Sequence, residues 1–294
     1  MSEAQVLKVP TKYESRVREL QYSFYLLRQS PLAVFGIVII TAIILAAILA
    51  PYIAPYGAQT RIWQDKLEPP SIHHLLGTDD RGGDIFSRIL YGYRLDLTIS
   101  LCVVLSATAV GTVVGAVAGF IRRLDELLMR ITDVFLSVPS LVLAMAFATV
   151  LGSNLINLVI ALVITWWPSY ARLVRGQVLV EKQKLYVEAA KASGGGPAHV
   201  LFKHVLPNSI YPILINATMD LGSVVLTTAS LSFLGFGIEA GGAELGRMVS
   251  DGSTYVFANP WVVAFPGLAI LFVSLGCNLV GDGLRDVLDP RLRR

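Results

Sequence analysis

The chain has 294 residues, of which 54% are hydrophobic and 15% are charged, whereas about a quarter are charged in an ordinary soluble domain. Its mean hydropathy of +0.62 argues against a soluble enzyme and against a disordered chain. The net charge of +3 is too small for a nucleic-acid-binding surface. Cys102 and Cys277 lie in apolar runs without a partner at disulfide or metal spacing, so we expect both to pack as small apolar residues.

Six apolar segments predict membrane-spanning helices, because each lacks interior Lys and Arg and a span needs about 20 mostly apolar residues. The segments are residues 32–50, 97–120, 131–151, 155–168, 208–231 and 260–281. The fourth segment is short, so it needs residues 151–154 or 169–174 as well to reach the length of a membrane span. The first exceeds the apolar core of a signal peptide, so we expect it to remain in the mature protein. The predicted fold class is an all-α, polytopic membrane protein.

The distribution of basic residues predicts the orientation. With the N-terminus inside, 18 of the 24 Lys and Arg fall on the inner side, as the positive-inside rule requires. Both termini are therefore expected in the cytoplasm. The predicted parts are an amphipathic lead-in at 1–31, a membrane domain at 32–281 and a cytoplasmic tail at 282–294. Two connections are too long for turns, namely the extracytoplasmic segment 51–96 and the cytoplasmic segment 169–207.

The cytoplasmic segment predicts two short helices with a sharp bend between them. Good helix formers run from Val178 to Ala192, and the glycines at 194–196 stop that helix. Pro197 suits the first turn of a second helix, which Pro207 should break. Such a helix–bend–helix is suited to docking on a partner protein, and an ordinary amphipathic surface hairpin is the alternative.

In this segment Glu188, Ala189 and Ala190 are followed four residues later by Gly194, and then by Leu206 and Pro207. This pattern resembles the EAA loop, the coupling element of permease subunits of bacterial and archaeal ABC importers. Residues 76–94, 229–237 and 278–293 also resemble the dipeptide and oligopeptide subfamily, in particular its C-type subunit. The resemblance implies the type I importer permease fold with six spans. The residues that it implies for coupling to the ATPase are Glu188, Ala189, Ala190, Gly194, His204, Leu206 and Pro207.

The resemblance also implies a function and a set of partners. The chain would be a permease subunit in the plasma membrane, without catalytic residues or a cofactor, forming half of a path for di- or oligopeptides. Its partners would be a B-type permease, two ATP-binding subunits, an extracytoplasmic solute-binding protein and membrane lipid. No Walker A motif occurs, so ATP hydrolysis must reside in another polypeptide. The alternatives are oligosaccharide or nickel as substrate, a secondary transporter or a membrane scaffold.

Two stretches depart from the family pattern. Gly195, Gly196 and Pro197 stand where a small residue and an acidic residue or serine are common before the second coupling helix. Residues 239–244 are glycine-rich, and Leu245 stands where tryptophan is expected. Because this second stretch is predicted to face outside, its departure bears on docking of the binding protein or on the substrate.

Intramembrane polar residues predict a translocation path. A carboxylate at Asp220 is costly against lipid, so it should face protein or water, and a structural helix contact is the alternative reading. Prolines 139, 168, 212 and 266 are expected to allow bends in the spans. The candidate path residues are Asn216, Asp220, Thr227 and Thr228.

Before the second span, apolar residues recur at helical spacing from Ile85 to Tyr93, which predicts a short amphipathic helix capped by Thr78 or Asp79. Its other face would carry Arg81, Asp84, Arg88 and Arg94. Of these, Arg88 and Arg94 are the candidates for docking the binding protein.

The four histidines give only a weak indication of a metal site. His73 and His74 are adjacent in the extracytoplasmic segment, while His199 and His204 lie five residues apart on the second coupling helix. At that spacing an α-helix places them on different faces. We therefore predict no metal site.

Overall fold

The computed structural model describes residues 28, 30–152, 154–237 and 242–288, so most of the predicted lead-in, the end of the tail and part of the glycine-rich stretch lie outside the described residues. The described chain consists of helices and connecting turns, with no β-strand. Its long apolar helices are α2 (Pro31–Ile53), α3 (Ile85–Phe120), α6 (Leu155–Glu181), α10 (Ile210–Phe233) and α12 (Trp261–Leu288). The bent pair α4 (Arg122–Leu136) and α5 (Ser140–Leu151) can supply a sixth span. The predicted all-α, polytopic fold is confirmed.

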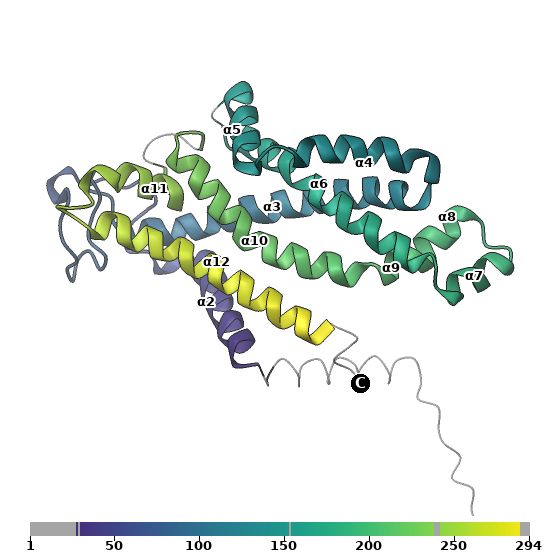
Figure 1. Ribbon diagram of the computed structural model, residues 1–294. Coiled ribbons are helices and arrows are strands. Elements are labelled where there is room, and N and C mark those ends of the chain that lie inside the picture. Colours follow the sequence, from purple (N-terminus) through teal and green to yellow (C-terminus); the bar gives the residue numbers. More distant parts are fainter. Residues whose placement is uncertain (1–27, 29, 153, 238–241, 289–294) are drawn as a thin grey trace, which may run out of the picture.

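The helices form an elongated bundle with a different irregular structure at each end (Figure 1). One end, the loop end, consists of residues 54–84, with the short helix η1 (Trp63–Asp65), and of α11 (Leu245–Gly252) and η3 (Ser253–Tyr255). At the opposite end lies the elbow, residues 185–208. It contains α7 (Leu185–Ala192), α8 (Pro197–Val200), the π-helix η2 (Leu201–Val205) and α9 (Leu206–Asn208). The two connections that are too long for turns therefore lie at opposite ends of the bundle.

Small residues let the long helices approach closely. Gly111, Gly115 and Gly119 recur every fourth residue on α3 and form a stripe against α6. A Cβ at Gly111 would collide with Tyr170, and one at Gly115 with the backbone oxygen of Ala171. Spacing small residues by four is a common way to pack membrane helices. This stripe makes α3 and α6 the tightest pair in the bundle.

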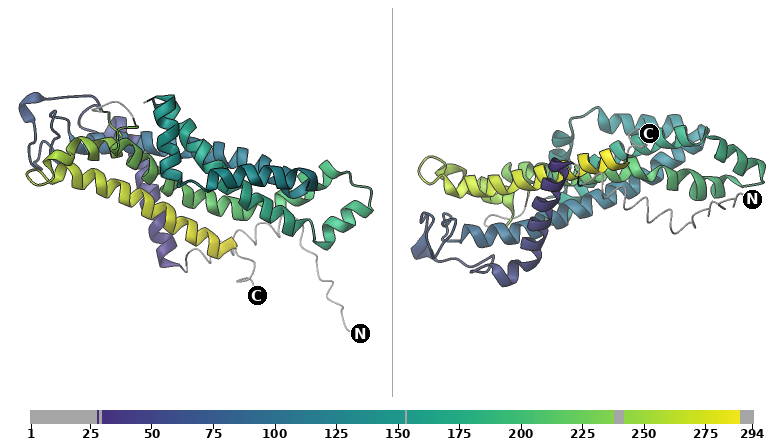
Figure 2. Two further views of the ribbon diagram at one scale, coloured as in Figure 1. Left: turned by 45° about the horizontal axis from the view of Figure 1, so that its top comes forward. Right: turned by 90° about the horizontal axis from the view of Figure 1, so that it is seen from below.

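Helix α2 crosses α12 at a steep angle rather than lying parallel to it (Figure 2). At the crossing, Gly36 of α2 faces Gly276 and Leu279 of α12, and an added Cβ there would lie 3.2 Å from the Gly276 carbonyl oxygen. Cys277 is buried on α12, whereas Cys102 is exposed on the outside of α3. Both cysteines lie among apolar residues, as predicted.

Three predicted spans have different boundaries in the structure. The second is one helix from Ile85 to Phe120, so the short amphipathic helix is not separate but is the first part of α3. Its cap is Asp84, whose Oδ2 accepts from the Ser87 amide at 2.8 Å, and not Thr78 or Asp79. The fourth extends to Glu181, and the sixth runs through Leu288 into the predicted tail. In each case the helix continues past the apolar run, because helix formation requires backbone hydrogen bonds and not contact with lipid.

The predicted third span, 131–151, is wrong as a continuous helix. The chain bends by 87° between α4 and α5. Pro139 stands directly before α5 and disfavours a helical conformation at Val138. Helix α4 is instead held to α6 by charges, with both carboxylate oxygens of Asp125 accepting from Arg175 at 3.0 and 2.7 Å.

Candidate functional site

The elbow contains the predicted bend but begins later than expected. The predicted helix from Val178 to Ala192 is divided, because α6 ends at Glu181 and α7 starts at Leu185. Gly194 has φ +84°, and the Gly195 amide donates to the Ala190 carbonyl at 3.0 Å, which closes the end of α7. Pro197 is the first residue of α8, as predicted. The bend therefore depends on a backbone conformation that glycine adopts more readily than other residues.

Pro207 does not break the second half of the elbow. Residues 201–205 form a π-helix, and the chain continues through Pro207 as α9. The Asn208 side chain donates to the His204 carbonyl at 2.5 Å. A π-helix winds i to i+5, so residues five apart fall on one face. The His199 and His204 rings accordingly lie 5.6 Å apart, and the expectation that they occupy different faces is wrong.

Three side chains hold the elbow and the link that precedes it to the bundle, namely Lys182, Lys184 and Tyr186. The buried Glu181 carboxylate accepts from the Tyr186 hydroxyl and from Lys184 Nζ, each at 2.6 Å. Burial, together with this carboxylate, raises the pKa of Tyr186 to about 12. Lys182 Nζ donates to the Gly119 carbonyl oxygen at 2.7 Å and so closes the end of α3. Tyr186 thus joins the elbow to α6, and Lys182 joins the link between α6 and α7 to α3.

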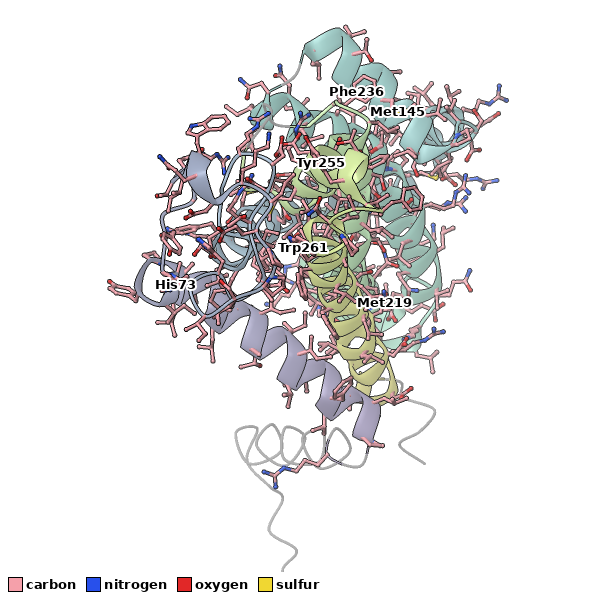
Figure 3. The ribbon with its side chains drawn as sticks, turned by 90° about the vertical axis from the view of Figure 1, so that its left-hand side faces the viewer. His73, Met145, Met219, Phe236, Tyr255 and Trp261 are labelled. Atoms are coloured by element: carbon pink, nitrogen blue, oxygen red, sulfur yellow. The ribbon has the colours of Figure 1, made fainter. Side chains whose placement is uncertain are left out.

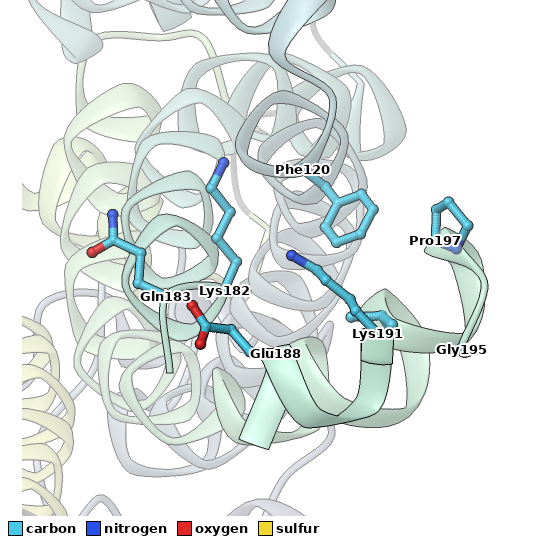
Figure 4. A pocket seen from close by; sticks show the side chains of 8 residues that line it. Phe120, Lys182, Gln183, Glu188, Lys191, Gly195 and Pro197 are labelled. Atoms are coloured by element: carbon cyan, nitrogen blue, oxygen red, sulfur yellow. The ribbon is translucent and has the colours of Figure 1, made fainter. Parts of the chain in front are cut away.

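The predicted coupling residues divide by exposure. Glu188, Ala189, Gly194 and Pro207 are exposed, whereas Ala190, His204 and Leu206 are half-buried. Between the elbow and the end of α3 lies the elbow hollow, of about 540 Å³. Figure 4 shows the side chains of Phe120, Lys182, Glu188 and Lys191 around it. Of the exposed coupling residues, Glu188 lines the elbow hollow, whereas Ala189, Gly194 and Pro207 do not.

A second hollow, the basal hollow, opens between α6, α10 and α12 and has a volume of about 790 Å³. Asn216 lines it and donates to the Asp220 carboxylate at 3.0 Å. Asp220 is half-buried and turned towards Trp166 and Tyr170 of α6. The structure therefore brings Asn216 and Asp220 together and turns Asp220 into the bundle.

The other two candidate path residues lie about two turns further along α10. Thr227 Oγ1 donates to the Ser223 carbonyl at 2.9 Å, and Thr228 is only 1% exposed. The structure does not bring them to the Asp220 cluster. Conversely, the sequence prediction omits Trp166 and Tyr170, although an aromatic and polar run at the end of the predicted fourth span, residues 166–170, could have indicated them.

At the loop end, the two candidate docking arginines differ. Arg94 is exposed, but Arg88 is 2% exposed, pairs with Asp79 and donates to the Gly242 carbonyl oxygen at 2.7 Å. The expectation that Arg88 lies on an outward polar face is wrong, because it ties two loops together inside. Leu245 is likewise fully buried and packs on Gly92. The departure at Leu245 therefore affects packing beneath the surface.

The adjacent histidines also have different environments. His73 is exposed at the edge of the loop end (Figure 3). His74 is buried with its Nδ1 3.0 Å from Asp84 and its Nε2 3.3 Å from Asp65, and Tyr56 stacks on its ring. Burial lowers the pKa of His74, but hydrogen bonds to Asp84 and Asp65 outweigh it, so the pKa lies above its usual value. His74 thus links the loop to the cap of α3.

Comparison with known proteins identifies the family. Residues 111–294 match the binding-protein-dependent transport system inner membrane component, and residues 20–70 match the N-terminal TM domain of oligopeptide transport permease C. The chain is 41% identical over 285 residues to the dipeptide transport system permease protein DppC of Alkalihalophilus pseudofirmus, covering 97% of this chain and 94% of that protein.

Two further relatives show similar coverage. The probable D,D-dipeptide transport system permease protein DdpC of Escherichia coli is 43% identical over 268 residues, covering 91% of this chain and 90% of that protein. The oligopeptide transport system permease protein OppC of Bacillus subtilis is 41% identical over 268 residues, covering 91% and 88%. The chain folds into a bundle of apolar helices with an elbow at one end, and transport permeases match it along nearly its whole length. It belongs to the family of binding-protein-dependent transport system inner membrane components and is a permease component of an importer.

Proposed function

We propose that this chain is the C-type permease subunit of an ATP-driven importer of di- or oligopeptides. It forms half of the translocation path, with a homologous B-type permease forming the other half. Two separate ATP-binding subunits drive it, and an extracytoplasmic binding protein delivers the solute. The names of the relatives support peptides over oligosaccharides and nickel. Membership of the permease family favours this reading over a secondary transporter or a scaffold.

The observation that carries the coupling role is the construction of the elbow. It stands at one end of the bundle, leaves Glu188 and Ala189 exposed, and is fastened through Glu181 to the long helix α6. Its second half leads through α9 towards α10, which carries Asn216 and Asp220. A partner bound to the elbow therefore acts on α6 and α10, two of the three long helices that line the basal hollow.

Coupling requires that ATP binds the inward-open and outward-open states of the transporter with different affinities. ATP can shift the transporter between inward-open and outward-open forms only as far as its binding free energy differs between them. The elbow can transmit that difference only if it keeps its shape. A rigid bend at Gly194 is thus part of the mechanism and not merely a connection.

Replacing Gly194 by valine tests this role. A β-branched residue at φ +84° costs about 1–3 kcal/mol, so the bend should open and transport should fall about tenfold or more. Gly196→Val is the matched control, because Gly196 has φ −64° and a Cβ there has no atom within 4 Å. Both variants should reach the membrane in equal amounts, which immunoblotting of purified membranes would measure.

The readouts are peptide uptake and peptide-stimulated ATPase activity of the reconstituted complex. We expect both to be lost together in Gly194→Val and retained in Gly196→Val. Normal coupled activity in Gly194→Val would contradict a coupling role for the bend. Uptake of nickel or an oligosaccharide, but of no peptide, by the unmodified complex would contradict the proposed substrate class.

A further inference from the structure

A third hollow lies at the 87° bend between α4 and α5 and has a volume of about 510 Å³, within the range of small-ligand sites. We call it the bend hollow. None of the described residues that line it is charged. They are Phe135, Leu136, Ser137, Val138, Pro139, Ser140, Thr165, Trp166 and Ser169.

Four hydroxyl groups line the bend hollow. Ser137 donates to the Val134 carbonyl at 2.7 Å and Thr165 to the Leu162 carbonyl at 2.8 Å, so each hydroxyl oxygen keeps acceptor capacity. Ser140 and Ser169 are exposed and make no side-chain hydrogen bond to the described part of the chain. The hollow therefore offers both donors and acceptors without a fixed charge, which suits the neutral amide groups of a peptide main chain.

Neighbouring charges indicate that this flank does not face acyl chains. Arg172 lies one turn beyond Ser169 on α6 and pairs with Asp133 of α4, their side chains being 56% and 60% exposed. The next pair on α4, Arg130 and Glu126, is 75% and 76% exposed. Exposed charges are expensive against lipid. The flank of α4 and α6 beside the bend hollow must therefore border water or another protein.

The bend hollow and the basal hollow follow one another along one flank of α6. Ser169 lines the first, and Leu173, Gln177 and Val180 line the second, at helical steps of four, four and three residues. Trp166 belongs to the bend hollow and lies beside Asp220, whose neighbour Asn216 lines the basal hollow. The two hollows are thus successive parts of one track, with Trp166 at their junction.

We propose that the bend hollow is a subsite for the main chain of the transported peptide, with Trp166 separating it from the basal hollow. This inference rests on the proposed function. The hydroxyl groups bind the amide groups of the peptide, and Phe135 and Trp166 provide an apolar surface that accommodates different peptide side chains. A subsite built in this way recognises the backbone and tolerates variation in sequence.

Thiol accessibility tests the subsite in the complete transporter in proteoliposomes. Ser140→Cys is placed in a background with Cys102→Ala and Cys277→Ala, and labelling by a charged methanethiosulfonate is followed during turnover with and without trialanine. We expect saturating trialanine to slow labelling about fivefold or more. Thr149→Cys, on the same helix α5 but outside the hollow, is the matched control and should label at the same rate in both conditions.

A second pair of variants measures the effect of filling the hollow. Ser140→Trp should reduce trialanine uptake about tenfold while the complex still assembles, and Thr149→Trp should leave uptake near normal. Failure of Ser140→Cys to label in every state, or labelling without protection by trialanine, would overturn the subsite. If the unmodified complex transports no peptide, the proposed function fails and the subsite with it. If it transports peptides but the cysteine is not protected, only the subsite is wrong.

Discussion

At the residue scale, His74 has the most unusual environment outside the spans. Its two ring nitrogens face two carboxylates, Asp84 at 3.0 Å and Asp65 at 3.3 Å, and its side chain is 2% exposed. Both contacts favour the protonated ring, and this raises its pKa against the effect of burial. Since Asp84 also caps α3, the protonation of one ring affects the start of the longest helix.

The raised pKa of His74 predicts a pH dependence of stability. A group whose folded pKa exceeds its unfolded value stabilises fully below the unfolded pKa, here about 6.5, and loses this contribution as pH rises through the folded value. His74→Gln should therefore lower the thermal stability of the purified protein most below pH about 6.5, by about 1–3 kcal/mol. The difference from wild type should shrink at alkaline pH.

The neighbouring histidine supplies the control for this prediction. His73 is exposed, so His73→Gln should leave the unfolding curve unchanged at each pH. If His74→Gln loses the same amount of thermal stability at every pH, the ring stabilises the fold by packing against Tyr56 and not by its charge.

Asp220 carries the second residue-scale prediction. Asp220→Asn keeps the size of the side chain and its contact with Asn216 but removes the charge. If Asp220 borders the path, assembly and basal ATPase activity should persist while peptide uptake falls. A cysteine at this position that stays inaccessible to aqueous thiol reagents in both inward- and outward-open states would make Asp220 a structural contact instead.

At the scale of elements, the glycine stripe of α3 predicts a sharp positional effect. Gly115→Val would place a side chain against the backbone oxygen of Ala171, which cannot rotate away. Overpacking of this kind costs about 1–3 kcal/mol, so α3 and α6 should separate and the yield of folded protein should drop. Gly176→Ala on α6 is the control, since a Cβ there has no atom within 4 Å. Size-exclusion profiles of the two variants in detergent would measure the difference, and a normal profile for Gly115→Val would show that the stripe is not needed for packing.

Local chemistry explains which elements could be predicted. Gly194 and Pro197 act through their own backbone preferences, so the bend of the elbow follows from the sequence. Hydropathy, by contrast, reports where a helix meets lipid, so it could not show that α6 continues to Glu181 in a polar sequence. The burial of Arg88 depends on Gly242, which is 154 residues away, and the contact of His74 with Asp65 depends on how the loop between them folds. No local pattern specifies them.

At the scale of the whole molecule, the two ends of the bundle should face opposite compartments. The predicted orientation places the elbow in the cytoplasm. A cysteine at Ile72, which is 94% exposed at the loop end, should react with a membrane-impermeant thiol reagent in intact cells or spheroplasts. A cysteine at Glu188 should react only after permeabilisation, in a background without Cys102. The reverse pattern would overturn the orientation.

The contact between α3 and α6 has a mechanical consequence. Helix α6 has 27 residues and spans about 40 Å at 1.5 Å per residue, and the glycine stripe of α3 contacts residues 167–178 in its second half. Closely packed helices move as one body, so a displacement of Glu181 should carry α3 and the second half of α6 together. Pro168 lies where this contact begins, and a proline is a point at which a helix bends. The first half of α6 should therefore tilt about Pro168 while the second half stays against α3.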